Sequence, residues 1–424
     1  MAGIELPEET KQQEERSGAP DVVVGVAGAV AAADLRARAE QVVADLGANA
    51  ASLRIVFARP GGDDEPTAGG ENQGGEQNGT GGHEKGHPTL VSYTAQASGG
   101  DLWSPISANQ RAVLALAASL NARVCIVLGP DLAGLQAHVI QLFTYAILER
   151  QCGLAMPIYP VGKYDGLLNT GILSPLSRAL YGKRVRYPLT FDFAASGAMC
   201  ERLAHGDAVS EASGLLWPVT VAATQTPQAV VGQVHIDVRH QVATAGLELS
   251  AVLGQLGGSM FEDMVSCASQ WQRVRGSQAA PVWGNEQVQE ADAAPIDAQP
   301  MLDSFLLGSK NLDEVWRLLL PPNTMLELRR LTRLTPEQFR IPDDVWASIV
   351  YDFALAWRLR TISRVHLMGA LTPLYLGWAA SYVREVSSMT SAATEQRVEQ
   401  FTRAWEEKKP YLLSRWRWPD RFNP

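Results

Sequence analysis

Short apolar runs alternate with longer amphipathic segments through the first half of the chain. Residues 21–26, 123–128 and 154–159 form almost continuously apolar runs, which are typical of parallel strands buried on both faces. Between such runs, segments such as 31–46 and 135–149 repeat apolar residues every three or four positions, as helices with one buried face do. This alternation predicts an α/β fold, a Rossmann-type sandwich whose parallel sheet is covered by helices.

The second half of the chain has a helical pattern. From residue 301 onward apolar positions recur at helical spacing, and one such stripe is formed by Val345, Ile349, Phe353 and Trp357. Other stretches hold too little apolar surface to offset the entropy of ordering, so we expect them to be flexible. The predicted organisation is a disordered lead-in at 1–20, an α/β domain at 21–275 with a flexible insertion at 61–88, a linker at 276–300 and a helical region at 301–424.

Composition narrows the class of protein. The 424 residues are 46% hydrophobic and carry a net charge of −9, which disfavours a general nucleic-acid binder because such proteins need excess positive charge. The four cysteines form no CxxC pair, so we expect reduced thiols and a cytoplasmic location. We expect no signal peptide and no transmembrane segment, because the chain has no apolar stretch of about 18 residues. Trp416 and Trp418 would suit contacts in a homo-oligomer.

The sequence Gly25-Val-Ala-Gly28 follows the first predicted strand and precedes a helix. Glycines at this turn could let a phosphate approach the helix N-terminus, but they also suit a tight strand-to-helix turn. The GxGxxG fingerprint is absent, and no acid follows the second strand at Phe57-Ala-Arg59 to hold a ribose. A nicotinamide-dependent oxidoreductase is therefore the least supported class of enzyme.

Asp131, His235 and Asp237 are candidate ligands for a divalent metal ion such as Mg²⁺ or Mn²⁺. Asp131 follows the strand at 123–128, and the carboxyl ends of strands in an α/β sheet face the ligand crevice. His235 and Asp237 are two apart on a predicted strand and share a face, with His240 nearby. Carboxylate and imidazole groups can bind such ions. Asp131 could equally cap the helix that follows it.

A loop and a basic cluster are candidate binding sites for a polar or anionic ligand. Residues 163–169 follow the strand at 154–159 and combine charged, aromatic and turn residues, which either bind a ligand or form a turn. Residues 178–186 form the densest positive cluster of this half, which suits either a bound phosphate or carboxylate or a solvated helix end. Asp192 lies in an apolar run and is either a cap or a desolvated reactive group.

The run 163–197 resembles a segment of bacterial GT-A glycosyltransferases, the family-2-like relatives of glucosyl-3-phosphoglycerate and mannosylglycerate synthases. The stretch 350–385 resembles the helical region of the same group, and the likeness extends with gaps from Asp21 to Arg417. The resemblance implies a GT-A-like fold, a nucleotide-sugar donor, a divalent metal and a small polar or anionic acceptor. It implies acceptor binding by Lys163, Tyr164, Asp165, Gly166, Asn169, Lys183, Arg184 and Arg186, a catalytic role for Asp192, and metal ligation by Asp131, His235 and Asp237.

Several positions depart from the family's pattern, and most of them are donor, metal or catalytic positions. The first acid of the family's Asp-x-Asp motif is Gly129 here, and Leu215 and Leu216 occupy a later carboxylate position. The loss of these acids weakens the stabilisation of charge on a departing diphosphate. We therefore expect sugar transfer to be weak or lost. The alternative is a non-catalytic binding or assembly protein that keeps the fold.

Overall fold

The computed structural model describes most of the chain. These are residues 19–47, 53–61, 88–95, 103–160, 162–204, 214–238, 240, 248–286 and 296–419. The insertion predicted at 61–88 and the lead-in predicted at 1–20 lie almost wholly outside the described residues. Contacts between residues divide the chain into two units. The first comprises 1–155, 191–205 and 238–241, and the second comprises 156–190, 206–237 and 242–424.

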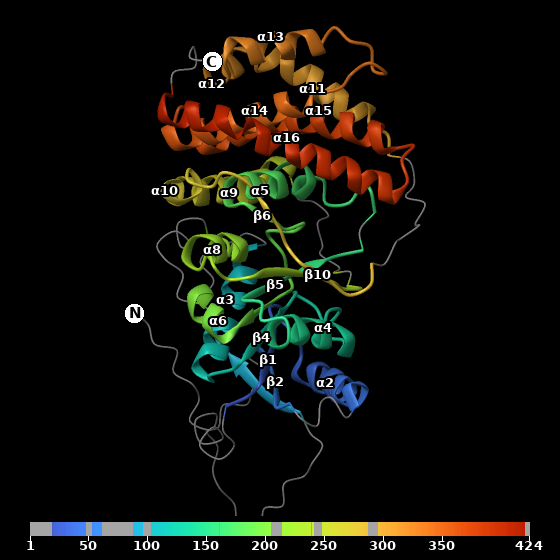
Figure 1. Cartoon of the computed structure of the whole chain (residues 1–424). Coiled ribbons are helices and arrows are strands. Elements are labelled where there is room, and N and C mark those ends of the chain that lie inside the picture. The colour runs from blue at the N-terminus through green and yellow to red at the C-terminus, as the bar shows by residue number, and fades with distance from the viewer. Residues whose placement is uncertain are drawn as a thin grey trace, which may run out of the picture. The chain divides into compact units, whose positions relative to one another are not determined.

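Eight strands are hydrogen-bonded in the order β10-β8-β5-β7-β4-β1-β2-β3 (Figure 1). Their bounds are β1 Val22–Val26, β2 Ile55–Pro60, β3 Thr89–Tyr93, β4 Val124–Leu128, β5 Leu154–Ile158, β7 Phe193–Ser196, β8 Val231–His235 and β10 Val282–Trp283. The prediction of an α/β fold followed by a helical region is confirmed. One feature differs, because β7 runs antiparallel to both β4 and β5. The short FAAS sequence of β7 leads directly into a helix, so no turn residue marks it as a strand.

In the first unit, helices cover the strands in two pairs. The helices are α2 Ala32–Leu46, α3 Trp103–Ser119, α4 Ala137–Leu148 and α6 Gly197–Ala204. The pair α2 and α4 and the pair α3 and α6 lie on either side of the strands β1, β2 and β4 (Figure 1). The buried residues of α2 are Leu35, Ala39, Val42 and Leu46, which is the apolar stripe expected from the sequence. The strands β1 and β4 are buried along their whole length, as parallel strands between two helical layers must be.

The second unit is mainly helical. Its helices are η2 Asn169–Leu173, α5 Ser174–Tyr181, α8 Pro218–Gln225, α9 Leu249–Ser266, α10 Ala268–Trp271, α11 Gln299–Asn311, α12 Asp313–Leu319, α13 Pro322–Leu331, α14 Asp343–Leu359, α15 Arg364–Val386 and α16 Ser391–Arg417. Two short strands, β6 Lys183–Arg184 and β9 Gln278–Ala279, pair with each other. The segment 276–300, interpreted from the sequence as a linker, contains β9, β10 and the first residues of α11.

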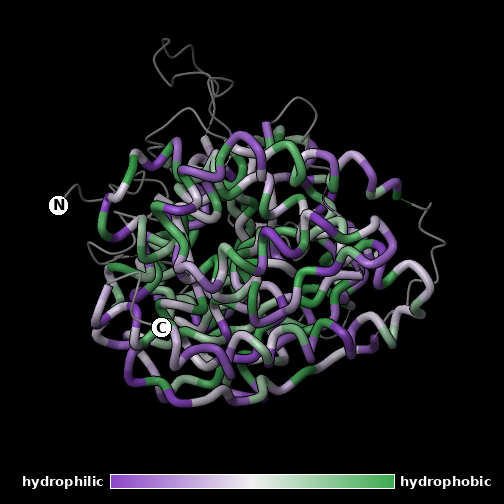
Figure 2. Tube along the Cα trace, turned by 90° about the horizontal axis from the view of Figure 1, so that it is seen from above, coloured by the Kyte–Doolittle hydropathy of each residue, from purple (hydrophilic) through white to green (hydrophobic). Residues whose placement is uncertain are grey.

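Short hydrophobic and hydrophilic stretches alternate along the chain. Figure 2 shows short green and purple stretches following one another along the trace, with few long blocks of either colour. This is the pattern of amphipathic elements that bury one face each. None of the described helices is long and apolar enough to cross a membrane.

A stack of aromatic rings holds the π-helix η2, which carries candidate acceptor residues, against the C-terminal helices. Gly171 lies under Trp378, and a Cβ atom added at Gly171 would lie 2.3 Å from that ring. Trp346 stacks on Trp378 with ring centroids 5.9 Å apart and donates its Nε1–H to the carbonyl oxygen of Gly171 at 2.8 Å. Only glycine therefore lets η2 approach the stack this closely.

Because the interior is closely packed, we expect Gly171→Ala to lower the free energy of unfolding by about 1–3 kcal/mol. The matched control is Gly369→Ala in α15, where an added Cβ would meet no atom within 4 Å. That change should raise the free energy of unfolding by about 0.5–1 kcal/mol, because alanine favours a helix more than glycine does. Urea denaturation of both variants measures the two effects. Equal stability of Gly171→Ala and the wild type would contradict this account of η2.

Candidate functional site

In the first unit, the imidazole of His240 lies between two carboxylates. Its Nδ1 is 2.8 Å from Oδ1 of Asp131, and its Nε2 is 2.5 Å from Oδ2 of Asp192. The His240 side chain is 4% exposed and Asp192 is completely buried, whereas Asp131 is 33% exposed. A neutral imidazole has only one N–H, so it could donate to only one of these acids. An imidazolium, in contrast, can donate to both carboxylates.

The carboxylates raise the pKa of His240. Burial by itself lowers this pKa, but hydrogen bonds and charge attraction from Asp192 and Asp131 outweigh it and raise the pKa above its ordinary value. Asp192 also accepts a hydrogen bond from the backbone N–H of Gly129 at 2.9 Å. Both oxygens of this buried carboxylate are thus engaged by donors, as a charge in a dry environment requires.

Close packing around His240 determines which residues can follow β4. A Cβ atom added at Gly129 would lie 2.4 Å from the His240 ring, so no side chain fits there while the imidazole is in place. A Cβ atom at Gly28 would lie 1.9 Å from the carbonyl oxygen of Pro130. Gly28, which the sequence marks as a phosphate-binding or turn position, therefore allows the turn after β1 to contact the turn after β4.

Aromatic and amide side chains complete the surroundings of His240. Phe191 meets the imidazole edge-on at 5.4 Å and stacks on Trp103 at 5.0 Å, both between ring centroids. Gln110 of α3 donates to the carbonyl oxygen of Phe191, and Asn109 donates to that of Ala27. These amides hold the loops on which the cluster depends.

The arrangement does not form a metal site with three protein ligands. Both ring nitrogens of His240 are committed to carboxylates, whereas a metal needs an unprotonated nitrogen. Within the described ranges, no group of three or more His, Cys, Asp or Glu residues could hold a metal ion. Of the ligands predicted from the sequence, Asp131 belongs to the first unit and contacts His240, whereas His235 and Asp237 belong to the second unit. Their joint role stays a prediction.

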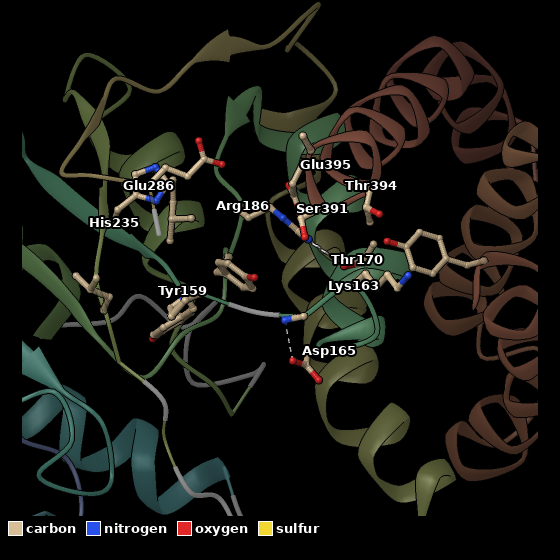
Figure 3. A pocket seen from close by; sticks show the side chains of 17 residues that line it. Tyr159, Lys163, Asp165, Thr170, Arg186, His235, Glu286, Ser391, Thr394 and Glu395 are labelled. Carbon is tan, nitrogen blue, oxygen red and sulfur yellow. Dashed lines mark hydrogen bonds and ion pairs between the residues drawn. The ribbon is translucent and has the colours of Figure 1, made fainter. Parts of the chain in front are cut away.

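In the second unit, a cavity of about 360 Å³ brings together several predicted acceptor residues. Lys163, Asp165 and Arg186 line it, and so does His235. Figure 3 shows the β8 residue His235 facing side chains from η2 and from the beginning of α16 across this space. The remaining polar side chains of the lining are those of Tyr159, Thr170, Tyr187, Glu286, Tyr382, Ser391, Thr394 and Glu395.

The charged groups of this cavity are held in place by neighbours. Both terminal nitrogens of Arg186 lie 3.3 Å from Oγ1 of Thr170, and Nη2 lies 3.4 Å from Oε1 of Glu395. Lys163 donates from Nζ to the carbonyl oxygen of Ser387 at 2.7 Å, just beyond the end of α15. Asp165 accepts the backbone N–H of Gly162 at 2.8 Å and thereby closes a tight turn. With Glu286, two cationic and three acidic side chains therefore surround the space, and the imidazole of His235 also lines it.

His235 is a neutral member of this cavity. Burial lowers the pKa of its imidazole, and the charge of Glu286 offsets only part of that effect. At neutral pH the ring can therefore donate one hydrogen bond and accept another.

Other predicted acceptor residues lie outside the cavity lining. The Lys183 amine is 3.4 Å from the carbonyl oxygen of Pro227, and Arg184 donates to the hydroxyl of Ser277. Asn169 donates to the carbonyl oxygen of Arg186, and so positions that residue. Gly166 has a φ of +60° in the turn before η2, and the ring of Tyr164 lies 5.3 Å from the Lys163 amine. Of the basic cluster, only Arg186 reaches the cavity lined by Asp165.

The sequence alone did not assign a role to His240 in the first unit, or to Tyr382 and Glu395 in the cavity of the second unit. It noted His240 only as a neighbour of His235 and Asp237. Glu395 and Tyr382 lie on amphipathic helices more than 190 residues after Arg186, and no local pattern distinguishes them from ordinary helical residues. The glycine at position 129, directly after an apolar strand, was the one available signal, because a residue without a side chain leaves room for another group.

Comparison with known proteins gives a distant structural similarity. No family model and no curated protein matches the sequence. The chain is structurally similar to glucosyl-3-phosphoglycerate synthase. A structure of that enzyme from Mycobacterium tuberculosis with phosphoglyceric acid has a TM-score of 0.36 and 12% identity, covering 61% of this chain and 84% of that chain. Its complex with Mn²⁺, uridine-diphosphate-glucose and phosphoglyceric acid has a TM-score of 0.37 and 13% identity, covering 63% and 86%. A further mycobacterial protein has a TM-score of 0.37 and 13% identity, covering 61% and 78%.

We expect His240→Gln to lower the free energy of unfolding by about 3–5 kcal/mol, because it leaves the Asp192 carboxylate buried without a counter-charge. The matched control is His366→Gln, which alters an exposed histidine. Urea denaturation at a series of pH values measures both variants.

The contribution of His240 to the free energy of unfolding should decrease as the pH rises. The raised pKa of His240 means that its stabilising effect is complete below the ordinary value of 6.5 and is lost as the pH rises through the folded-state value. The difference between wild type and His240→Gln should therefore shrink as the pH is raised above 6.5. A difference that grows over that range would contradict the imidazolium assignment.

Proposed function

We propose that this protein is a glycosyltransferase-type protein that binds a small polar or anionic acceptor and whose transfer of sugar from a nucleotide sugar is weak or lost. The observation that carries this proposal is the position of His240 between Asp131 and Asp192, over Gly129. Asp192 belongs to the stretch 163–197 that resembles the glycosyltransferases, and Gly129 stands where the family pattern has the first acid of Asp-x-Asp. His240 contacts both positions.

The chemistry of sugar transfer explains why this position matters. Departure of a nucleoside diphosphate needs a cation or donors that stabilise the developing charge, an effect worth several kcal/mol. Carboxylates at the end of β4 would hold that cation, but here the side chain of Asp131 and that of Asp192 are paired with an imidazolium. Asp192 is completely buried, with Oδ2 on His240 and Oδ1 on the backbone N–H of Gly129, so it is badly placed to contact an acceptor.

The cavity of the second unit is suited to a hydroxylated acid. Asp165, Glu286 and Glu395 can accept hydrogen bonds from hydroxyl groups, while Arg186 can donate to a carboxylate or phosphate. A volume of about 360 Å³ fits a small molecule. We therefore propose that the acceptor pocket is retained, with phosphoglyceric acid, which the similar synthase binds, as the first probe.

A second candidate is a binding or assembly protein with no catalysis at all. The apolar pair Leu215 and Leu216, both buried, favours it, because it stands where the family pattern has a carboxylate. The two candidates differ in whether any sugar is transferred.

We expect the purified full chain to transfer little or no sugar from UDP- or GDP-sugars to phosphoglyceric acid, with or without Mn²⁺ or Mg²⁺. Chromatographic detection of the glycosylated product measures turnover, and calorimetric titration of UDP and GDP measures donor binding. Slow transfer supports the weakened enzyme, and its complete absence supports the binding protein. The proposal would be overturned by fast, metal-dependent transfer that is abolished by Asp131→Ala and kept by Asp45→Ala, a change of an exposed acid in the same unit.

Anion binding by the cavity gives a separate test. We expect Arg186→Gln to weaken binding of phosphoglyceric acid about tenfold or more, which is the effect of losing a charge-assisted hydrogen bond. Lys183→Gln is the matched control, because it removes a basic residue of the same cluster that does not line the cavity. Titration calorimetry compares the two. Equal weakening by both changes would place the anion outside the cavity.

A further inference from the structure

A second, larger cavity lies among the helices of the second unit, away from the proposed acceptor pocket. Its volume is about 840 Å³, within the range of small-molecule sites. Residues from the beginning of α9, from α12, from the end of α14 and from the beginning of α15 line it. Its lining is mainly apolar and includes Leu312, Val315, Trp357, Ile362 and Met368.

Two helical glycines keep this cavity open. The second unit has seven described helical glycines, and at five of them an added Cβ would lie 2.3–3.1 Å from a packed side chain. Those five are Gly171, Gly257, Gly258, Gly308 and Gly377. Gly254 and Gly369 are the other two; both line the cavity, and an added Cβ at either would meet no atom within 4 Å. Glycine within a helix costs about 1 kcal/mol relative to alanine. Here no packing contact requires it, so its effect is to leave space.

The cavity lining combines buried apolar side chains with exposed basic ones. Met368 and Trp357 are buried, at 2% and 7% exposure, whereas Arg364 and His366 are exposed. Arg364 pairs through Nη2 with Glu262 and lies 4.3 Å above the ring of Trp357. His366 lies with Nδ1 2.9 Å from the hydroxyl of Ser363, whose oxygen accepts the backbone N–H of His366. With that hydroxyl donating to Nδ1, the proton of a neutral His366 lies on Nε2.

Among the described residues, the lining contains the basic side chains of Arg364 and His366 and no aspartate or glutamate. Glu262, next to the lining, pairs with Nη2 of Arg364 and accepts the Nε1–H of Trp357, which leaves the other N–H groups of the guanidinium to face the cavity. An apolar chamber that opens beside two donors matches a molecule with a long apolar part and one anionic end. A neutral hydrocarbon would make no use of the His366 imidazole or of the guanidinium N–H groups that Glu262 does not engage.

We propose that this cavity binds a single-chain carboxylate amphiphile of the fatty-acid class. The hydrocarbon chain lies between α9 and α15 against Met368 and Trp357, and the carboxylate accepts hydrogen bonds from Arg364 and His366. This site is independent of the proposed sugar chemistry, because it shares no lining residue with the acceptor cavity.

Titration calorimetry of the full chain with dodecanoate, below the concentration at which it forms micelles, tests the proposal. We expect saturable binding of one molecule per chain, about tenfold or more tighter than binding of dodecanol, because the alcohol lacks the charge-assisted hydrogen bonds. Absence of saturable binding, or equal affinity for the acid and the alcohol, would overturn the proposal.

Matched variants locate the binding site. Gly254→Leu should abolish binding by filling the cavity, whereas Gly276→Leu should not. Gly276 also has no atom within 4 Å of an added Cβ but does not line the cavity. Arg364→Gln should weaken dodecanoate about tenfold and leave dodecanol unchanged, because only the acid uses the guanidinium. Arg330→Gln, which removes an exposed arginine paired with Glu327, is its control.

A labelling experiment on the wild type does not depend on the folding of any variant. Dodecanoate carrying a photoreactive diazirine at its far end should attach to residues of α9 or α15, as mass spectrometry of the digested protein would show. Unchanged binding by Gly254→Leu, or attachment confined to other segments, would overturn the assignment.

Discussion

The ion pair between His240 and two carboxylates determines much of the first unit's candidate site. A completely buried Asp192 needs a donor for each oxygen, and the Gly129 backbone and the His240 ring provide them. The ring in turn requires glycine at position 129, because any side chain would overlap it. Glycine at position 129 and the histidine that lies over it are therefore one structural feature.

In the second unit, a polar cavity lies against a cluster of aromatic side chains. Trp346 and Trp378 stack and fix Gly171, so that Thr170 next to it contacts Arg186. Arg186 is then shared between Thr170 and Glu395 of α16. A charged side chain that is held at both sides loses little further freedom when a ligand binds, which favours affinity. The cavity thus owes its arrangement to aromatic packing directly behind its lining, where Trp378 stacks on Tyr382.

Glycine has opposite effects in the two cavities. At Gly171 its lack of a side chain permits contact, whereas at Gly254 and Gly369 it leaves an opening that nothing among the described residues fills. The same residue type within a helix therefore marks close packing in one place and open space in another. Only the surrounding atoms distinguish the two, and that distinction is what separates a structural glycine from one that shapes a binding site.

The sequence by itself determined the α/β class, the helical second half and the amphipathic faces, because apolar periodicity is a local property that survives in any arrangement of the elements. It also singled out Asp131, Asp192, Lys163, Asp165 and Arg186 as candidate site residues, because they follow predicted strands, interrupt apolar runs or belong to a basic cluster. It could not pair them. His240 is 109 residues from Asp131 and 48 from Asp192, and Glu395 is 209 from Arg186. The short antiparallel β7 was missed for a similar reason, since its neighbours β4 and β5 are remote in sequence. Which charges meet, and which glycines border open space, was decided only by the tertiary structure, because such contacts depend on how distant segments pack.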